Sequence, residues 1–188
     1  YGLALSPKEI KEEYNHFANK LYTVGYLMFG HKFDDQALVV RLQDANNIRT
    51  SKAQGGTGKS FLIKSLYYYT KLLSYDELDG RQKDLFKNSH WNENINANTD
   101  IVFIDDLHRY FPINEMYTFA TNSLKINVKG ISQFSLGYDK SPKFITASNY
   151  ISTDLDASTM RRSLFVGNSD FFHDNTNKEY KENRRISD

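Results

Sequence analysis

The chain has 188 residues, of which 39% are hydrophobic and 25% are charged, and its formal net charge at pH 7 is +1. This length can bury one sizeable core, so we expect one main domain; because the chain starts at Tyr1 rather than Met, we expect it to be a piece of a longer protein. The near-neutral charge requires any nucleic-acid contact to come from local basic clusters. The absence of cysteine excludes disulfides, thiolate zinc sites and cysteine nucleophiles. No apolar run approaches the ~18 residues that cross a bilayer, and no signal peptide is visible, so we expect a cytoplasmic protein.

Residues 1–30 are predicted to form an N-terminal helical region ahead of the main domain at 31–188. Ser6 is a suitable N-cap, with proline next and Glu9 at the third helical position. Apolar side chains then recur at helical spacing, and we expect them to belong to the core: Ile10, Tyr14, Phe17, Leu21 and Val24.

The segment AQGGTGKS at residues 53–60 predicts a phosphate-binding loop. Its glycines let successive backbone N–H groups converge on phosphate oxygens, Lys59 can reach the outer phosphates, and the Ser60 hydroxyl can hold Mg²⁺. The pattern G-x-x-x-x-G-K-[ST] fails at one position, since Ala53 replaces its first glycine. The residues expected to contact the nucleotide are Gln54, Gly55, Gly56, Thr57, Gly58, Lys59, Ser60 and Phe61.

An amphipathic helix at residues 61–66 should follow the loop, with its positive N-terminal end facing the phosphates. The strand that leads into the loop is ambiguous. Residues 38–42 are apolar but end well before Gly55, whereas residues 48–51 are adjacent but polar, and the sequence does not decide between them.

Residues 74–99 are polar and broken by Gly80 and several asparagines, and the asparagine-rich stretch 90–98, which contains Trp91, is predicted to be a loop or a short insertion. The next segment, 100–107, contains four consecutive apolar residues followed by Asp105 and Asp106. Continuous apolarity indicates a strand buried on both faces of a parallel sheet, and its carboxyl end is where ligands bind in such sheets.

A second strand is predicted at 143–149, ending in Asn149, whose amide could orient water beside a γ-phosphate. Arg161 and Arg162 come shortly afterwards. Paired arginines are most often solvated, but in a ring-forming ATPase they could reach the nucleotide of a neighbouring subunit.

Together, QGGTGKS, IVFIDDL, SPKFITASNY and MRRSLFVGNSDFF resemble the superfamily 3 helicases of viruses, phages and plasmids, which are AAA+ P-loop ATPases. The likeness is to the helicase half of phage and mobile-element primase-helicases, and it covers about residues 21–188. It implies a three-layer α/β fold with a mostly parallel central sheet.

The resemblance also implies roles for individual residues. Lys59 and Ser60 match the Walker A lysine and magnesium-binding hydroxyl. Asp105 and Asp106 match the Walker B acids, of which one supports Mg²⁺ and the other, more often the second, polarises water; we assign the metal to Ser60 and Asp105. Asn149 matches the polar sensor. Either Arg161 or Arg162 matches the arginine that acts in trans, and which of them acts stays open.

Residues 124–134 look like the hairpin with which this family grips single-stranded DNA. Lys125 and Lys129 would supply salt-sensitive phosphate contacts. From the residues alone an ordinary solvated hairpin is equally plausible, and the resemblance favours DNA.

The expected function is that of a DNA helicase domain that uses Mg²⁺ and ATP to translocate single-stranded or forked DNA, as a homo-oligomeric, hexameric ring, in phage, plasmid or viral replication. The compartment would be the bacterial host cytoplasm, with no membrane partner. The alternatives are an AAA+ ATPase that remodels or loads another protein, a small-molecule kinase, and a DNA-binding module that holds nucleotide only structurally.

Overall fold

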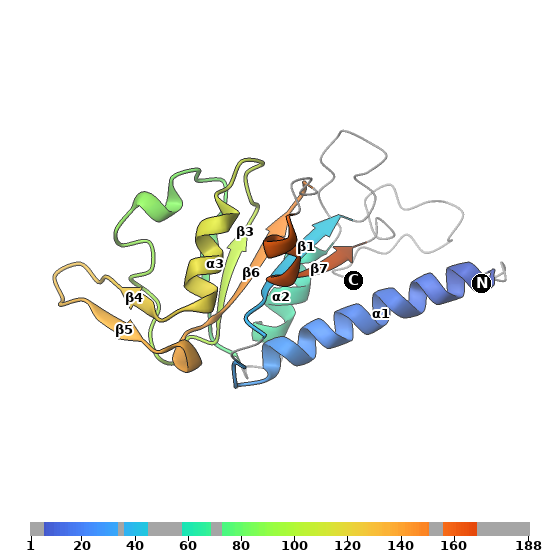
Figure 1. Ribbon diagram of the computed structural model, residues 1–188, viewed down its shortest axis with the longest axis horizontal. Coiled ribbons are helices and arrows are strands. Elements are labelled where there is room, and N and C mark those ends of the chain that lie inside the picture. The colour runs from blue at the N-terminus through green and yellow to red at the C-terminus, as the bar shows by residue number, and fades with distance from the viewer. Residues whose placement is uncertain (1–5, 34–35, 45–57, 69–72, 151–155, 169–188) are drawn as a thin grey trace.

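The computed structural model describes residues 6–33, 36–44, 58–68, 73–150 and 156–168. Within them, five parallel strands form one sheet in the order β2-β3-β6-β1-β7 (Figure 1). The strands are β1 (Val39–Asp44), β2 (Tyr75–Asp79), β3 (Ile101–Asp105), β6 (Lys143–Ser148) and β7 (Ser163–Asn168). This is the α/β fold with a mostly parallel sheet that the sequence predicts.

The sheet has a separate apolar cluster on each face, so the domain has three layers. Alternate residues of β3 point to opposite sides, because the side chains of a strand alternate with a period of two. Val102 and Ile104 pack against α3 (Ile113–Thr121), whereas Ile101 and Phe103 share a cluster with side chains of α2 (Lys59–Tyr68). The α2 and α3 helices therefore cover opposite faces.

Helix α1 (Pro7–Met28) begins as predicted, with a capping box formed by Ser6 and Glu9. The expectation that its apolar side chains lie in the core is wrong for four of the five. Ile10, Tyr14, Phe17 and Leu21 are 55–69% exposed. In Figure 1 the helix runs away from the body of the domain, and only its C-terminal part packs against the sheet, through residues such as Leu27.

Two points about the sheet were left open by the sequence. β1 is the strand at residues 39–44, so the apolar candidate is a sheet strand, whereas residues 48–51 lie outside the described part. The polar 74–99 stretch begins with a strand that the sequence analysis does not predict, because β2 forms the sheet edge there. The rest of that stretch is turns and a short 3-10 helix, η1 (Leu85–Lys87), and residues 90–98 form the predicted loop.

Residues 124–136 form the predicted hairpin. β4 (Leu124–Ile126) pairs antiparallel with β5 (Phe134–Leu136), outside the main sheet. Figure 1 shows this hairpin projecting from the side of the domain opposite the free part of α1. The remaining elements are the 3-10 helix η2 (Tyr138–Lys140) and the short helix α4 (Ala157–Arg161).

Among the described helices, none combines the length and apolarity needed to cross a membrane.

Candidate nucleotide site

The candidate site lies at the edge where the parallel strands end. β6 lies between β1 and β3, and its last residues pair in register with β1, with Gln43 opposite Ser148. Asp44 and Asn149 are therefore the next residues on adjacent strands. Because β3 runs parallel on the other side of β6, Asp105 reaches the same edge.

The predicted phosphate-binding loop immediately precedes α2 in the sequence, and the first two residues of α2 are Lys59 and Ser60. Gly58 has φ +81°, a left-handed conformation that glycine adopts without steric cost. The N-terminal N–H groups and the dipole of α2 favour an anion here. The predicted loop residues Gln54, Gly55, Gly56 and Thr57 lie outside the described part of the chain.

The Lys59 ammonium forms an ion pair with a residue that the sequence analysis missed. Its Nζ lies 2.5 Å from Asp44 Oδ1, and the two side chains are 8% and 3% exposed. Removing one partner of a buried ion pair is costly, because the other charge stays buried and loses that interaction. The sequence does contain a signal for Asp44, because it is an acid that lies two residues after the expected end of the apolar strand at residue 42.

Ser60 and Asp105, the two predicted magnesium ligands, are in direct contact. Ser60 Oγ lies 2.9 Å from both carboxylate oxygens of Asp105. Hydroxyl and carboxylate oxygens suit Mg²⁺, which usually takes one or two protein ligands together with phosphates and water. No cluster of three or more His, Cys, Asp or Glu side chains that could hold a metal alone is found in the described residues. The donor set therefore fits a magnesium ion that is shared with a nucleotide.

Asp106 and Asn149 are also brought together. Asn149 Nδ2 donates to Asp106 Oδ1 at 3.3 Å. Asp106 has φ +53°, the only positive φ of a described non-glycine residue, and its backbone N–H donates to Asp105 Oδ1 at 2.9 Å. This left-handed turn directs two consecutive carboxylates differently, Asp105 toward Ser60 and Asp106 toward Asn149.

The turn after β3 is held by neighbouring backbone. Gly80 N–H donates to the Asp105 carbonyl at 2.7 Å, and Leu107 N–H donates to the Ala147 carbonyl at 2.8 Å. A Cβ at Gly80 would lie 2.7 Å from that Asp105 oxygen. Strands β2 and β6 thus fix the turn that carries both acids.

A second lysine, Lys64, stands one helical turn after Ser60 and also faces the acids. Its Nζ lies 3.0 Å from Glu77 Oε1 and 4.0 Å from Asp105 Oδ2. The hydrogen bond to Glu77 raises the pKa of Lys64, so it stays cationic at neutral pH. Sequence analysis did not identify it, because its role depends on the missed strand β2.

Arg161 and Arg162 lie near the amino ends of the parallel strands, away from the carboxyl ends that form the candidate site. Val39 N–H, at the start of β1, donates to the Arg162 carbonyl at 2.8 Å. Asn168, at the carboxyl end of β7, is six residues further on, or roughly 20 Å at 3.3 Å per residue. Both side chains are exposed, and the structure does not bring either of them to the nucleotide site of the same chain.

Lys125 and Lys129 are exposed on the hairpin, on β4 and in the connecting loop. The hairpin forms a two-stranded sheet of its own, apart from the candidate nucleotide site at the carboxyl ends of the main-sheet strands.

Comparison with known proteins adds a fold relationship to this geometry. No protein-family model matches the chain, and no curated protein does. Two solved structures of the NrS-1 C-terminal region, both apo, are similar to it. One has a TM-score of 0.50 at 16% identity and the other, of residues 305–718, has 0.50 at 19% identity. They cover 84% and 82% of this chain, which spans only 34% and 32% of theirs. At this identity the likeness supports a shared fold.

Proposed function

We propose that this domain hydrolyses ATP with Mg²⁺ and uses the energy to move single-stranded DNA, as a superfamily 3-like helicase domain. One observation carries the ATPase part: the lysine that begins α2, a hydroxyl–carboxylate pair and an acid–amide pair lie at the carboxyl ends of the strands of one parallel sheet. Strand ends and a helix N-terminus of this kind bind nucleotide phosphates.

The roles follow from chemistry and position. Lys59 would exchange its Asp44 partner for the phosphates, which offer equivalent anionic oxygens. Ser60 and Asp105 would hold Mg²⁺, which when bound neutralises charge on the phosphates. Asp106 would accept a proton from the attacking water, and Asn149, already bonded to Asp106, would orient that water.

The proposal that Arg161 or Arg162 acts in trans agrees with their distance from the site of their own chain. A neighbouring copy would have to place the amino ends of its strands, where these arginines lie, against this site. An arginine that contacts the γ-phosphoryl group is worth about 10³–10⁵ in rate. A homo-oligomeric ring, with DNA bound through the Lys125 and Lys129 hairpin, is the assembly that this implies.

The test is ATP hydrolysis measured with and without single-stranded DNA over a range of protein concentrations, together with strand displacement on a forked duplex. We expect stimulation by DNA, a rate that rises faster than linearly with concentration, and unwinding. Asp106→Asn should lose at least ~100-fold in turnover but still bind nucleotide, because asparagine tolerates the left-handed backbone and cannot accept the proton. Asp139→Asn, which changes an exposed acid on η2, is the matched control.

Two results would overturn parts of the proposal. Full turnover in Asp106→Asn would contradict the assigned chemistry. ATP hydrolysis that ignores DNA and leaves the duplex intact would instead favour an ATPase that remodels or loads another protein.

A further inference from the structure

A pocket of about 380 Å³ opens between the hairpin, α3 and the β2–β3 connection. It lies beside the hairpin and contains none of the residues assigned to ATP chemistry. Eleven residues line it, and none of them is acidic. This volume falls in the range of about 300–1,000 Å³ that small-molecule sites occupy, so it suits one nucleotide rather than a duplex.

One wall of the pocket is aromatic. Phe86 packs edge-on against Trp91 and Phe119, with ring centroids 5.1 Å apart in both cases, and Trp91 and Phe119 lie 5.0 Å apart. All three are partly exposed although they pack on the core. Rings that are held by one another and open on one side offer a face for stacking.

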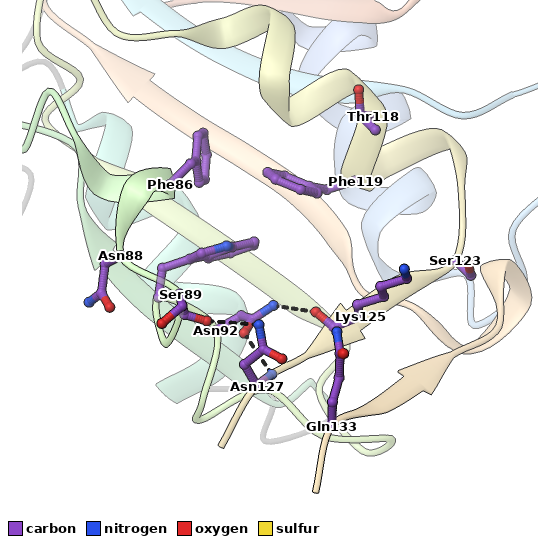
Figure 2. Close-up of a pocket in the computed structure, with 11 residues that line it drawn as sticks. Phe86, Asn88, Ser89, Asn92, Thr118, Phe119, Ser123, Lys125, Asn127 and Gln133 are labelled. Atoms are coloured by element: carbon purple, nitrogen blue, oxygen red, sulfur yellow. Dashed lines mark hydrogen bonds between the residues drawn. The ribbon is translucent and has the colours of Figure 1, made fainter. Parts of the chain in front are cut away.

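The opposite wall is polar and rigidly held. Figure 2 shows Asn92 and Asn127 below the phenylalanine rings, with Lys125 and Gln133 toward the hairpin strands. Asn92, which is 2% exposed, donates through Nδ2 to the Lys125 carbonyl at 2.7 Å and accepts from Asn127 N–H at 3.2 Å. Asn127 Nδ2 in turn donates to the Ser89 carbonyl at 3.0 Å. These bonds join the β2–β3 connection to the hairpin, so the pocket exists before any ligand binds.

Two side chains at the pocket remain available for a ligand. The Lys125 ammonium has no ion-pair partner among the residues that the structure describes, and the exposed Gln133 amide makes no hydrogen bond to them. The pocket thus combines aromatic faces, a neutral amide that can donate and accept, and a cation, with no carboxylate to repel an anion.

We propose that this pocket binds one nucleotide of single-stranded DNA, with the base against the Trp91–Phe119 wall and the adjacent phosphate at Lys125. Stacking is tolerant of sequence because every base has a π face, and the amide can meet either donors or acceptors on the base edge. The proposal rests on the proposed DNA binding and adds a base contact to the phosphate contacts of the hairpin. In this arrangement the base contacts the aromatic wall and the phosphate contacts Lys125 on the polar wall, so one nucleotide uses both walls of the pocket.

The test uses Trp91, the only tryptophan in the chain. A labelled oligothymidylate is titrated with the full chain while its anisotropy reports binding and the indole emission reports the pocket. We expect saturable quenching of Trp91 that follows the anisotropy curve. An oligonucleotide with the same phosphates but abasic sites should bind at least about fivefold more weakly and leave the emission unchanged, because it has nothing to stack.

A variant pair checks the aromatic wall. Phe119→Leu should weaken binding of the normal oligonucleotide by about fivefold and leave abasic binding unchanged. Tyr14→Leu, which removes an aromatic ring that is 69% exposed on α1, should change neither. The abasic comparison needs no variant, so it stands even if Phe119→Leu folds poorly.

The outcomes separate this inference from the function on which it rests. Binding by anisotropy with unchanged Trp91 emission, or equal quenching by the abasic strand, overturns the base pocket and leaves the DNA-binding proposal intact. No binding of either oligonucleotide overturns both.

Discussion

At the scale of single residues, the pairing of Lys59 with Asp44 is the feature with the clearest energetic consequence. A carboxylate holds the ammonium that we propose for the phosphates, and both groups are nearly buried. Nucleotide and Asp44 would therefore compete for the same cation. In our proposal the ion pair would stabilise the nucleotide-free protein and would weaken nucleotide binding by the free energy needed to replace it.

Replacing Asp44 with asparagine should separate these two effects. Without nucleotide, the free energy of unfolding should fall by about 3 kcal/mol, because Lys59 keeps its buried charge and loses its carboxylate. Saturating MgATP should then stabilise Asp44→Asn more than the wild type. Denaturant unfolding with and without MgATP measures both. Asp84→Asn, which breaks an exposed pair with Lys87, is the control and should behave like the wild type. A variant that gains no more from nucleotide than the wild type would contradict the competition.

At the scale of elements, the close approach of β2 to the turn after β3 makes Gly80 sensitive. A Cβ there would lie 2.7 Å from the Asp105 carbonyl oxygen and 2.9 Å from Leu107 Cα, and backbone atoms cannot move away cheaply. Gly80→Ala should therefore destabilise the protein by about 1–3 kcal/mol. Gly25→Ala is the matched change, since nothing lies within 4 Å of its Cβ and it is in α1. That variant should gain about 0.5–1 kcal/mol of helix stability. Thermal or denaturant unfolding measures the stability of both variants. Equal changes in the free energy of unfolding would contradict this account of the turn.

The hairpin makes a prediction about salt. If Lys125 and Lys129 each contact one phosphate, each alanine variant should lower the slope of log binding constant against log salt by about 0.7 for single-stranded DNA. Lys11→Ala removes an exposed lysine of α1 and should leave the slope unchanged. Anisotropy titrations at several salt concentrations measure it. Identical slopes for all three variants would contradict the proposal that Lys125 and Lys129 contact the phosphates.

The elements also show why some of the fold was predictable and some was not. β3 was predicted because both of its faces are buried and it begins with four consecutive apolar residues, whereas β6 was predicted from apolar residues such as Phe144 and Ile145, although it also carries Lys143, Thr146 and Ser148. β2 was missed because an edge strand, only partly buried, carries three acids in five residues. The exposed stripe of α1 was misassigned because amphipathic spacing reveals a helix face but not whether anything covers it.

The same reasoning applies to the site. Ser60, Asp105, Asp106 and Asn149 were predicted and do meet, because strand ends in a parallel sheet share an edge. Asp44 and the pocket at Trp91 were not predicted, since each depends on contacts between segments that are distant in sequence. No periodicity or motif records such contacts.

At the scale of the whole molecule, two buried lysines fasten the end of α1 to the sheet. Lys143 Nζ, at the start of β6, donates to the carbonyls of Tyr26 and Phe29, and Lys32 Nζ donates to Ser141 Oγ at 2.7 Å. Cations near helix C-terminal carbonyls are favourable. Burial nevertheless lowers the pKa of each lysine from 10.5 to about 8.

This depression predicts how stability depends on pH. Between about pH 8 and pH 10 the unfolded chain keeps protons that the folded protein has released, so the free energy of unfolding should rise with pH over this window. Below pH 8 both lysines are protonated in the folded and the unfolded state, so these sites no longer make the free energy of unfolding depend on pH. Denaturant unfolding at a series of pH values measures the trend. Lys32→Met combined with Lys143→Met should flatten it, and a wild-type stability that falls across the window would contradict the assignment.

A structure determined with Mg²⁺ and a non-hydrolysable ATP analogue tests the central claim most directly. We predict Mg²⁺ at about 2.1 Å from Ser60 Oγ, Lys59 on the phosphates instead of on Asp44, and the terminal phosphate facing Asp106 and Asn149. Nucleotide bound at another place, or at this edge with Asp106 and Asn149 turned away from it, would contradict the account.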